Sequence, residues 1–518
     1  MPAKRKNDAS LDLNPEFLKA FDLAEKQHKN LFLTGRAGTG KSTFLQYFVQ
    51  NTDKHCVVLA PTGVAALNVD GSTIHAFFRF TPQITQQEVI KKARSSKKDP
   101  LYTQLDLIIV DEISMVRADL FDSMDLFLRT ARASREPFGG VQMLLIGDLY
   151  QLPPVVKSKE KKFFSEVYQS PFFFGSHVIR ESGFALEFVE LEKIYRQKDQ
   201  KFIDILNAAR NNTLADKLLK RLNTRVDPDF ENQDYITLTP TNDLADAINR
   251  RELGKLKSKA KTYVASVRGD FRAGSFPTEQ ELKLKPGTRV MLLNNDASGL
   301  WVNGSIGDIV ALHDDYVEVR LDDGSEVEVE PYKWEVKQYV FDPKAGQLSS
   351  EPVGSFRQLP MRLAWAVTIH KSQGKTFDRV IVDTGRGMFA HGQAYVALSR
   401  CRTLEGMVLR KPFKKNNLWV DWQVIKFLTG FQYAISEKAV SLEDKVALLK
   451  KAKKAKLPVK ITYLKAKDVK SKRTIMVKRI GTEEYMDKKF LGVTAYCLLR
   501  KQERVFRVDR ILEMEVGE

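Results

Sequence analysis

The sequence is poor in cysteine and in long apolar segments. Its three cysteines, Cys56, Cys401 and Cys497, stand far apart among 518 residues and show no CxxC spacing. We therefore expect a reduced compartment and no zinc site. The basic start MPAKRKND is not followed by the apolar core of a signal peptide. No apolar run has the length that a bilayer requires, so we expect a cytoplasmic protein without a membrane partner.

Acidic residues are outnumbered by basic ones, and the imbalance is uneven along the chain. There are 83 Lys and Arg against 65 Asp and Glu, a formal charge of +18. From Ser441 to Glu518 the counts are 21 and 11, so this segment holds more than half of the excess. This concentration favours an anionic partner, either nucleic acid or an anionic membrane. A solvated basic surface explains the charge on its own equally well.

Short apolar runs recur in the first half of the chain, each followed by turn residues and a helical stretch. The pattern is typical of buried parallel strands joined by crossover helices, which indicates an α/β fold. The same pattern recurs later in the chain, at Ile236–Leu238 and Val380–Val382, so we expect a second α/β domain. The runs of the first half are Leu31–Leu33, Val57–Leu59, Leu107–Val110 and Met143–Ile146.

Two segments with other sequence patterns lie between or after these α/β segments. Residues from about Tyr263 to Ser355 alternate apolar and polar positions between tight turns, which predicts a small all-β barrel inserted into the second α/β domain. Ser441–Lys456 is a Lys-rich amphipathic helix that we expect to act as a connector, and the chain from Leu457 onward is again β-rich.

A phosphate-binding loop stands between the first apolar run and a helical stretch. Residues 35–42, GRAGTGKS, fit GxxxxGK[ST], in which backbone N–H groups wrap the phosphates at a helix N-terminus. Lys41 is expected to neutralise the β- and γ-phosphates of ATP, and the Ser42 hydroxyl to ligate Mg²⁺. The residues expected to contact the nucleotide here are Gly35, Ala37, Gly38, Thr39, Gly40, Lys41, Ser42 and Thr43.

Polar residues follow two later strands and complete a hydrolytic set. Asp111 is predicted to hold Mg²⁺, directly or through water, and Glu112 to polarise the attacking water. Gln151, in GDLYQLPP, is predicted to sense the γ-phosphate and couple its loss to movement. A Pro-stiffened surface loop is the alternative for this last segment.

These motifs and those that follow them resemble the superfamily-one B-group helicases, most closely the Pif (petite integration frequency) family. The resemblance covers roughly residues 13–430, with all motifs in order. Beyond the phosphate loop, the residues that carry it are APTGVAA (60–66), GSTIH (71–75), DEISM (111–115), PFGG (137–140), GDLYQLPPV (147–155), YRQ (195–197), LTPTN (238–242), AVTIHKSQG (366–374) and YVALSR (395–400).

The resemblance implies two RecA-like P-loop motor domains with ATP between them. Arg196 and Arg400 would be arginine fingers at the γ-phosphate, and Gly374 would also contact the nucleotide. The first motor domain would span 1–190, with a wedge at about 77–100, and the second would span 191–262 and 356–435. The remaining segments would be a Src-homology-three-like barrel at 263–355, a basic helical connector at 436–456 and a WYL-like domain at 457–518.

The WYL resemblance of the tail is carried by ITY (461–463), SKR (471–473), AYC (495–497) and ERVFRVDRI (503–511). The Trp-Tyr-Leu tripeptide itself is missing, and LGV (491–493) stands near its place. We expect Arg504 and Arg507 of this tail to contact DNA. The alternative is a regulatory domain that docks on the motor or binds a small anionic ligand.

Other positions match the single-strand channel of the Pif family. Hydroxyls, backbone N–H groups and one lysine are better suited to contact DNA phosphates than to recognise individual bases. The matching residues are Pro61, Thr62, Gly63, His75, Phe77, Thr241, Thr368, His370 and Lys371. The family's glutamine that grips adenine has no counterpart, since 13–18 reads LNPEFL and the next glutamine is Gln27.

The resemblance implies an ATP-dependent DNA helicase that moves 5′ to 3′ on single-stranded DNA and unwinds forked or structured DNA, G-quadruplexes included. We expect a bacterial, nucleoid-associated monomer that works in DNA repair or telomere maintenance beside other replication or repair proteins. The alternatives are a RecD-like subunit of a nuclease complex and a DNA-binding regulator that uses ATP only as a switch. The regulator would not need Glu112, Gln151 and both arginine fingers.

Overall fold

The computed structural model describes residues 12–517, apart from Pro82, Ser182, Gln233, Arg386, Phe389, Met486 and Asp487. The chain divides into two compact units. Unit 1 holds Asp216–Leu418 and the residues up to Leu206, and unit 2 holds Asn207–Ala215 and the residues from Trp419 on.

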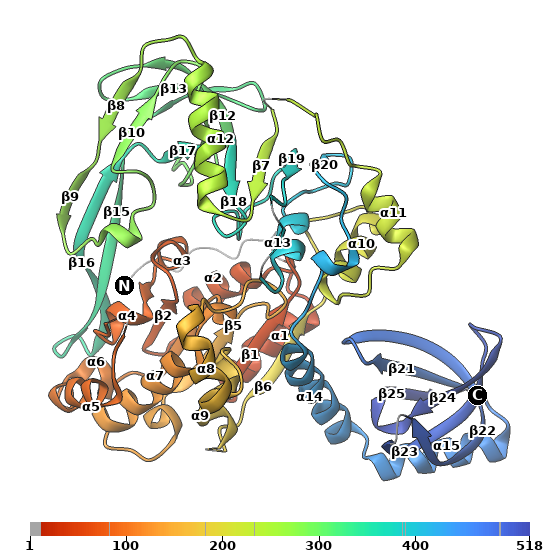
Figure 1. Ribbon diagram of the computed structural model, residues 1–518. Coiled ribbons are helices and arrows are strands. Elements are labelled where there is room, and N and C mark those ends of the chain that lie inside the picture. The colour runs from red at the N-terminus through yellow and green to blue at the C-terminus, as the bar shows by residue number, and fades with distance from the viewer. Residues whose placement is uncertain are drawn as a thin grey trace. The chain divides into compact units, whose positions relative to one another are not determined.

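The first half of unit 1 is built on a parallel sheet in the order β3-β2-β4-β5-β1-β6 (Figure 1). The four apolar runs expected to be strands lie in this sheet, as β1, β2, β4 and β5, so the prediction is confirmed. The strands are β1 (Leu31–Gly35), β2 (Cys56–Ala60), β3 (Ser72–Thr73), β4 (Leu107–Val110), β5 (Gln142–Ile146) and β6 (Glu187–Leu191).

Apolar side chains cover this sheet on both faces, which is why its strands read as continuous apolar runs. Every residue of β1, β4 and β5 is buried. Phe17, Phe44 and Phe48 pack against β1 and β5 in one core cluster. The helices of this part are α1 (Pro15–Phe21), α2 (Lys41–Asn51), α3 (Gly63–Asn68), α4 (Ile74–Phe77), α5 (Gln86–Ser95), α6 (Pro100–Thr103), α7 (Ala118–Ala131), α8 (Lys161–Phe163) and α9 (His177–Arg180).

A second parallel sheet follows in the order β18-β7-β19-β20. Ile236–Leu238 and Val380–Val382 lie in it as predicted, and all residues of these strands are buried. Its strands and the helices of this region are β7 (Ile236–Thr239), β18 (Ala366–Thr368), β19 (Val380–Val382), β20 (Met407–Leu409), α10 (Gln200–Arg210), α11 (Asp216–Asn223), α12 (Asn242–Lys255) and α13 (Gln393–Ser399).

The chain between β7 and β18 is β-rich, as its alternating pattern predicted. An antiparallel sheet in the order β14-β13-β12-β11-β17 encloses a core that includes Leu282, Val290 and Val319. The strands here are β8 (Lys261–Val264), β9 (Ser266–Gly269), β10 (Glu281–Leu284), β11 (Arg289–Leu292), β12 (Ile306–Leu312), β13 (Val317–Leu321), β14 (Glu326–Val329), β15 (Tyr332–Asp342), β16 (Gln347–Gln358) and β17 (Met361–Leu363).

The long hairpin of β15 and β16 extends from this region to the first sheet (Figure 1). The Tyr339 hydroxyl accepts the backbone N–H of Val58 on β2 at 3.0 Å. Lys337 binds Asp70 at 2.6 Å, and His55 lies 3.1 Å from the carbonyl oxygen of Gly346. Sequence periodicity predicted a β-rich segment here but not this docking, because the contacts join residues hundreds of positions apart.

Unit 2 contains an antiparallel sheet in the order β24-β23-β22-β21-β25. Leu449 and Ala452 of α15 are fully buried against Val459, Ile475 and other sheet residues. The helix that we expected to be a connector is therefore part of the core of unit 2. The elements are α14 (Trp422–Ala439), α15 (Leu442–Ala455), β21 (Val459–Lys465), β22 (Val469–Tyr485), β23 (Lys488–Cys497), β24 (Gln502–Arg507) and β25 (Ile511–Val516).

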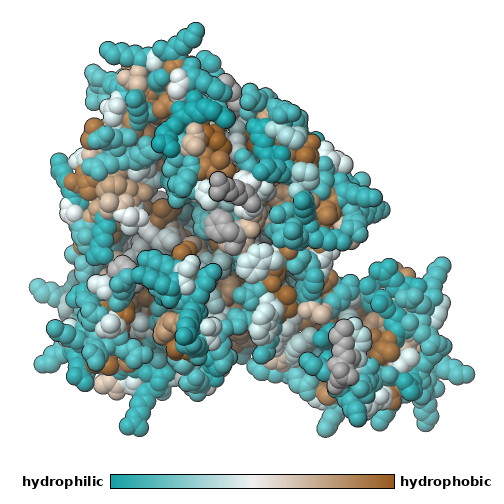
Figure 2. Space-filling model, viewed as in Figure 1, coloured by the Kyte–Doolittle hydropathy of each residue, from teal (hydrophilic) through white to brown (hydrophobic). Residues whose placement is uncertain are grey.

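In Figure 2 the visible face is mostly hydrophilic, with hydrophobic side chains scattered over it. Across the described parts of the chain, none of the helices combines the length and the apolar character needed to cross a membrane.

Candidate active site

The phosphate loop connects β1 to α2 and turns through two glycines with positive φ. Gly38 has φ +80° and Gly40 has φ +91°, where a side chain would strain the backbone. Gly38 is also crowded, because an added Cβ would lie 2.4 Å from the Cβ of Arg196. The loop therefore presents backbone N–H groups rather than side chains to its ligand.

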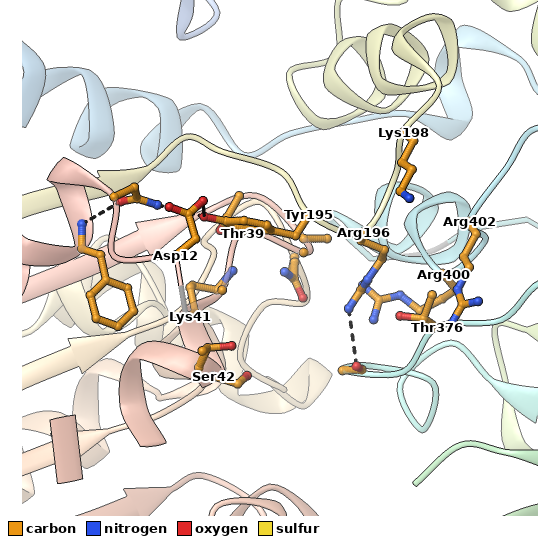
Figure 3. A pocket seen from close by; sticks show the side chains of 18 of the residues that line it. Asp12, Thr39, Lys41, Ser42, Tyr195, Arg196, Lys198, Thr376, Arg400 and Arg402 are labelled. Carbon is orange, nitrogen blue, oxygen red and sulfur yellow. Dashed lines mark hydrogen bonds between the residues drawn. The ribbon is translucent and has the colours of Figure 1, made fainter. Parts of the chain in front are cut away.

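Lys41 curls back over this loop. Its Nζ donates to the carbonyl oxygens of Gly35 at 2.7 Å and Arg36 at 3.1 Å. The ammonium is thus held where a bound anion gains most from it, since the N-terminus of α2 adds its own dipole there. Ser42 and Thr43 are exposed on the first turn of α2. Figure 3 shows Lys41 and Ser42 on the same side of the pocket.

Two carboxyl groups follow β4 at the edge of the pocket. Glu112 has φ 49° and ψ 44°, a left-handed conformation that strains a residue other than glycine. Burial, and then the neighbouring Asp111, raise the pKa of Glu112 to about 7. Burial also raises the pKa of Asp111, while Lys41 lowers it. A carboxyl group with a pKa near neutrality suits a proton acceptor.

The residues expected to hold Mg²⁺ have the oxygen ligands that this ion prefers. Asp111 offers a carboxylate beside the phosphate loop and Ser42 a hydroxyl at the start of α2. Two adjacent carboxyl groups whose pKa values are raised by burial gain from a nearby divalent cation. This donor set therefore fits a magnesium ion that also binds phosphate oxygens.

Gln151 lies beyond the end of β5 and is 6% exposed. Its Nε2 donates to Asp148 at 3.2 Å, and its backbone N–H to the carbonyl oxygen of Asp148 at 2.9 Å. Gly392, which precedes α13, packs against it, because an added Cβ there would lie 2.2 Å from the carbonyl oxygen of Gln151. Gln151 is thus held inside the cleft between the two parallel sheets.

The two predicted arginine fingers also lie in this cleft. Arg400, at the C-terminal end of α13, is 1% exposed, and burial followed by Arg196 lowers its pKa. Its Nη1 donates to the carbonyl oxygens of Ser372 at 3.4 Å and Lys375 at 3.1 Å. Arg196 donates to the carbonyl oxygen of Gly374 at 3.5 Å. Both guanidinium groups therefore lie opposite Lys41 (Figure 3).

One pocket of about 930 Å³ joins most of these groups, although Gly35 and Asp111 are not among its lining residues. Glu112, Gln151 and Arg400 line it together with residues 37–43 of the phosphate loop. Asp12, Asn14, Phe17, Tyr195 and Lys198 belong to the same lining. The predicted catalytic and nucleotide-binding residues that line the pocket are Ala37, Gly38, Thr39, Gly40, Lys41, Ser42, Thr43, Glu112, Gln151, Arg196, Gly374 and Arg400.

The segment where the adenine-gripping glutamine was expected lines the pocket with other groups. Phe17 is 4% exposed and packs against Phe44, with ring centroids 5.0 Å apart. Asn14 caps α1 and donates to the Tyr195 hydroxyl at 3.2 Å. Gln27 instead donates to Asp22 at 2.7 Å. Tyr195 belongs to the motif YRQ, but nothing in the sequence predicted that it lines the pocket.

The predicted strand-binding residues lie at the ends of strands in both parallel sheets. Thr62 and Thr241 each cap a helix that follows a strand, accepting the backbone N–H groups of Ala65 at 3.2 Å and Leu244 at 3.4 Å. Pro61 and Gly63 flank the first of these caps. The repeated arrangement places one hydroxyl at a matching position of each sheet.

The remaining predicted contacts differ in exposure. Lys371 is exposed, and burial lowers the pKa of His75 and of His370. Thr368 is 4% exposed and accepts the backbone N–H of Lys371 at 3.3 Å. Phe77 is 5% exposed, because its ring packs edge-on against Phe78 and Tyr102.

The two tail arginines belong to unit 2. Arg507 binds Asp509 through two hydrogen bonds, of 3.0 and 2.6 Å, and lies over the ring of Phe490. Arg504 is exposed on β24. Burial, followed by Arg473, Arg500 and Arg504, lowers the pKa of Lys465, so these four cations are neighbours.

Known proteins resemble this chain in sequence. The family model described as PIF1-like helicase matches residues 13–219. The ATP-dependent DNA helicase Pif1 of Bdellovibrio bacteriovorus is 32% identical over 431 residues, which cover 82% of this chain and 93% of that protein. The human ATP-dependent DNA helicase PIF1 is 34% identical over 73% of this chain, but the match covers only 58% of the human protein.

Solved structures agree with the sequence matches. Bacteroides sp Pif1 in complex with ADP-AlF4 matches with a TM-score of 0.73 and 38% identity, over 82% of this chain and 97% of that one. The Bacteroides Pif1 structure bound to ssDNA matches with a TM-score of 0.58 at the same identity, over 81% and 97%. These matches establish an α/β fold with a RecA-like parallel-sheet core.

Lys41→Ala and Glu112→Gln should each remove nearly all ATP turnover. The lysine binds phosphate charge, whereas the glutamate acts on water, so only Glu112→Gln should still bind ATP. Loss of a general base lowers turnover by about 10² to 10⁴. Steady-state hydrolysis assays and binding of a fluorescent ATP analogue measure the two effects. Near-normal turnover in Glu112→Gln would show that another group activates the water.

Proposed function

We propose that this chain, which belongs to the PIF1-like helicase family and is an ATP-dependent DNA helicase, moves 5′ to 3′ along single-stranded DNA and unwinds forked or structured DNA ahead of it. The observation that supports this most is the cleft itself. The phosphate loop and Glu112 come from one parallel sheet, and Arg400 comes from the other. Because the nucleotide contacts residues from both sheets, its binding and its hydrolysis are linked to the position of one sheet relative to the other.

ATP binds with its phosphates on the N–H groups of residues 35–43 and on Lys41. Ser42 and Asp111 hold Mg²⁺, which when bound neutralises part of the phosphate charge. Glu112 then accepts a proton from water while the water oxygen bonds to the γ-phosphorus and the bond to ADP breaks. Arg400 and Arg196 stabilise the charge on the transferring phosphoryl group.

The residues at the strand ends are proposed to hold the DNA backbone. Thr62 and Thr241 lie at matching positions of the two sheets, so each sheet can hold its own stretch of the strand. Lys371 adds a cation, and Pro61, Gly63, His75, Thr368 and His370 belong to the same set. Hydroxyl and N–H contacts to phosphate carry little base preference. Sliding of one sheet relative to the other would then advance the strand.

Finer domain assignments are also proposals. The antiparallel sheet around Val290 and Val319 supports a Src-homology-three-like barrel at about 263–355. Residues 77–100, which include α5 with its Thr85–Glu88 capping box, are proposed as the wedge that meets the duplex. We retain 1–190 and the pair 191–262 and 356–435 as the two motor domains.

We propose that the tail, residues 457–518, is a WYL-like domain that binds single-stranded DNA. The support is the cluster of Lys465, Arg473, Arg500 and Arg504 on one part of unit 2. Guanidinium groups bind phosphates bidentately and stack on bases. Because Arg507 already binds Asp509, we expect Arg504 to contribute more to DNA affinity than Arg507.

The enzyme should unwind a duplex that bears a 5′ single-stranded tail and fail on one with only a 3′ tail. The direction is carried over from the Pif-family resemblance, and the tail is needed because the motor must bind single-stranded DNA before it meets the duplex. Strand displacement on two substrates of identical duplex sequence measures this, with a blunt duplex as control. Unwinding that depends on a 3′ tail would overturn the proposed polarity.

Replacing Arg473, Arg500 and Arg504 together by glutamine should lower the affinity for single-stranded DNA. It should also make that affinity less dependent on the salt concentration. Each lost phosphate contact lowers the slope of log affinity against log salt by about 0.7, so we expect a decrease of about 2. Fluorescence anisotropy over a salt series measures it in the full chain.

The control removes the same charge from the exposed face of α15, through Lys451, Lys453 and Lys454→Gln. This variant should keep the salt slope within about 0.7 of the wild type, since it loses no phosphate contact. Equal losses in both variants would mean that net charge, and not the cluster around Lys465, carries the affinity.

A further inference from the structure

Gln373 lies in a tight turn that follows β18. The backbone N–H of Ser372 donates to the carbonyl oxygen of Thr368 at 3.0 Å, and that of Gln373 to the carbonyl oxygen of His370 at 3.2 Å. The Thr368 hydroxyl accepts the N–H of Lys371 at 3.3 Å. These bonds hold the backbone of residues 368–373 in one turn, so a displacement at one end of the turn also moves the other end.

One side of this turn reaches the proposed general base. The Gln373 side chain donates its Nε2 to Glu112 Oε2 at 2.9 Å and to Gln151 Oε1 at 3.4 Å. Glu112 is held on a left-handed backbone, which aims its carboxylate but does not fix its side-chain torsions. A neutral amide donor fixes the carboxylate without competing as a second base. The sequence motif AVTIHKSQG contains Gln373 but indicates no individual role for it.

The backbone of the same turn holds both arginine fingers. Arg400 donates to the carbonyl oxygens of Ser372 and Lys375, and Arg196 to that of Gly374. A guanidinium that turns toward a γ-phosphate must exchange these carbonyl oxygens for phosphate oxygens. The position of the turn is therefore sensitive to the nucleotide as well as to whatever binds its other side.

That other side carries Thr368, His370 and the exposed Lys371, which are proposed to hold DNA phosphates. One residue separates Lys371 from Gln373, so a phosphate bound at the lysine lies one short turn away from the contact to Glu112. A side-chain amide that is fixed in this way can place the carboxylate to within the tolerance that proton transfer demands.

We infer that Gln373 is a positioning residue that holds the Glu112 carboxylate ready for the attacking water, and that DNA bound along Thr368, His370 and Lys371 sets its position. This inference rests on the proposed function, because it assigns a physical route by which single-stranded DNA stimulates ATP hydrolysis. DNA on the strand side would restrain the turn further, so that the contact to Glu112 contributes more to turnover when DNA is bound.

Gln373→Met tests the inference, since methionine keeps the length of the side chain and removes its hydrogen bonds. With saturating oligo-deoxythymidine, kcat should fall by about tenfold or more, a part of what a general base supplies. Basal kcat should fall by a smaller factor than kcat with DNA, and the KM for ATP and the nucleotide-free affinity for the oligonucleotide should each stay within about threefold. A role in folding alone would not separate kcat with DNA from these three quantities.

Gln373→Glu provides a second variant that keeps size and polarity but faces Glu112 with another carboxylate. Its DNA-stimulated kcat should fall at least as far as that of Gln373→Met. If Gln373 only filled space, glutamate would be the milder change. Gln200→Met is the matched control, because it also removes a glutamine-to-carboxylate bond, to Asp204 at 2.9 Å on the exposed face of α10. It should behave as the wild type.

The relay from the strand side is tested by combining Gln373→Met with Lys371→Ala. If both act through the turn, their effects on the stimulation by DNA are not additive. Additive losses, a stimulated kcat within threefold of the wild type, or equal falls with and without DNA would each overturn the inference. A wild-type protein whose ATP turnover does not respond to oligo-deoxythymidine would instead contradict the proposed function, before any variant is compared.

Discussion

The hydrogen bond between the backbone N–H of Ala37 and the hydroxyl of Tyr395 joins the two halves of the motor. It is 3.0 Å long and buried, and it connects the phosphate loop of the first parallel sheet to α13 beside the second. His391 reaches the carbonyl oxygen of Leu149 at 2.8 Å, and Gly392 lies against Gln151. Because the first of these contacts lies on the phosphate loop itself, a nucleotide there acts on the interface that positions both arginine fingers.

This interface also explains how a cation can be almost fully buried. Arg400 is 1% exposed, and a buried guanidinium is stable only when its donors are satisfied. The carbonyl oxygens of Val396, Ser372 and Lys375 accept its N–H groups. Carbonyl oxygens are weaker partners for a guanidinium than phosphate oxygens, so the arrangement favours exchange when an anion enters.

Local sequence patterns predicted the parts of this structure that depend on local chemistry. The buried strands, the phosphate loop and Glu112 are visible as apolar runs and glycine spacing, because burial and backbone turns impose them residue by residue. The sequence could not show that α15 packs into unit 2, because an amphipathic helix looks the same whichever sheet covers its apolar face.

The contacts that turn these parts into one site were not predictable from the chain alone. Gln373 and Glu112 are separated by 261 positions, and Tyr395 and Ala37 by 358. The burial of Phe77 likewise depends on Tyr102 and on a hairpin that arrives from β15. Such pairs arise from tertiary packing, which leaves no periodic signal in a single sequence.

The central claim is that Arg400 completes the nucleotide site and does not hold DNA. Arg400→Ala separates the two roles when ATP turnover and nucleotide-free DNA affinity are measured on the same preparation. The account predicts that turnover falls by about a thousandfold, as is usual for an arginine finger, while DNA affinity is retained. A parallel collapse of DNA affinity would place Arg400 in the strand channel and contradict the account.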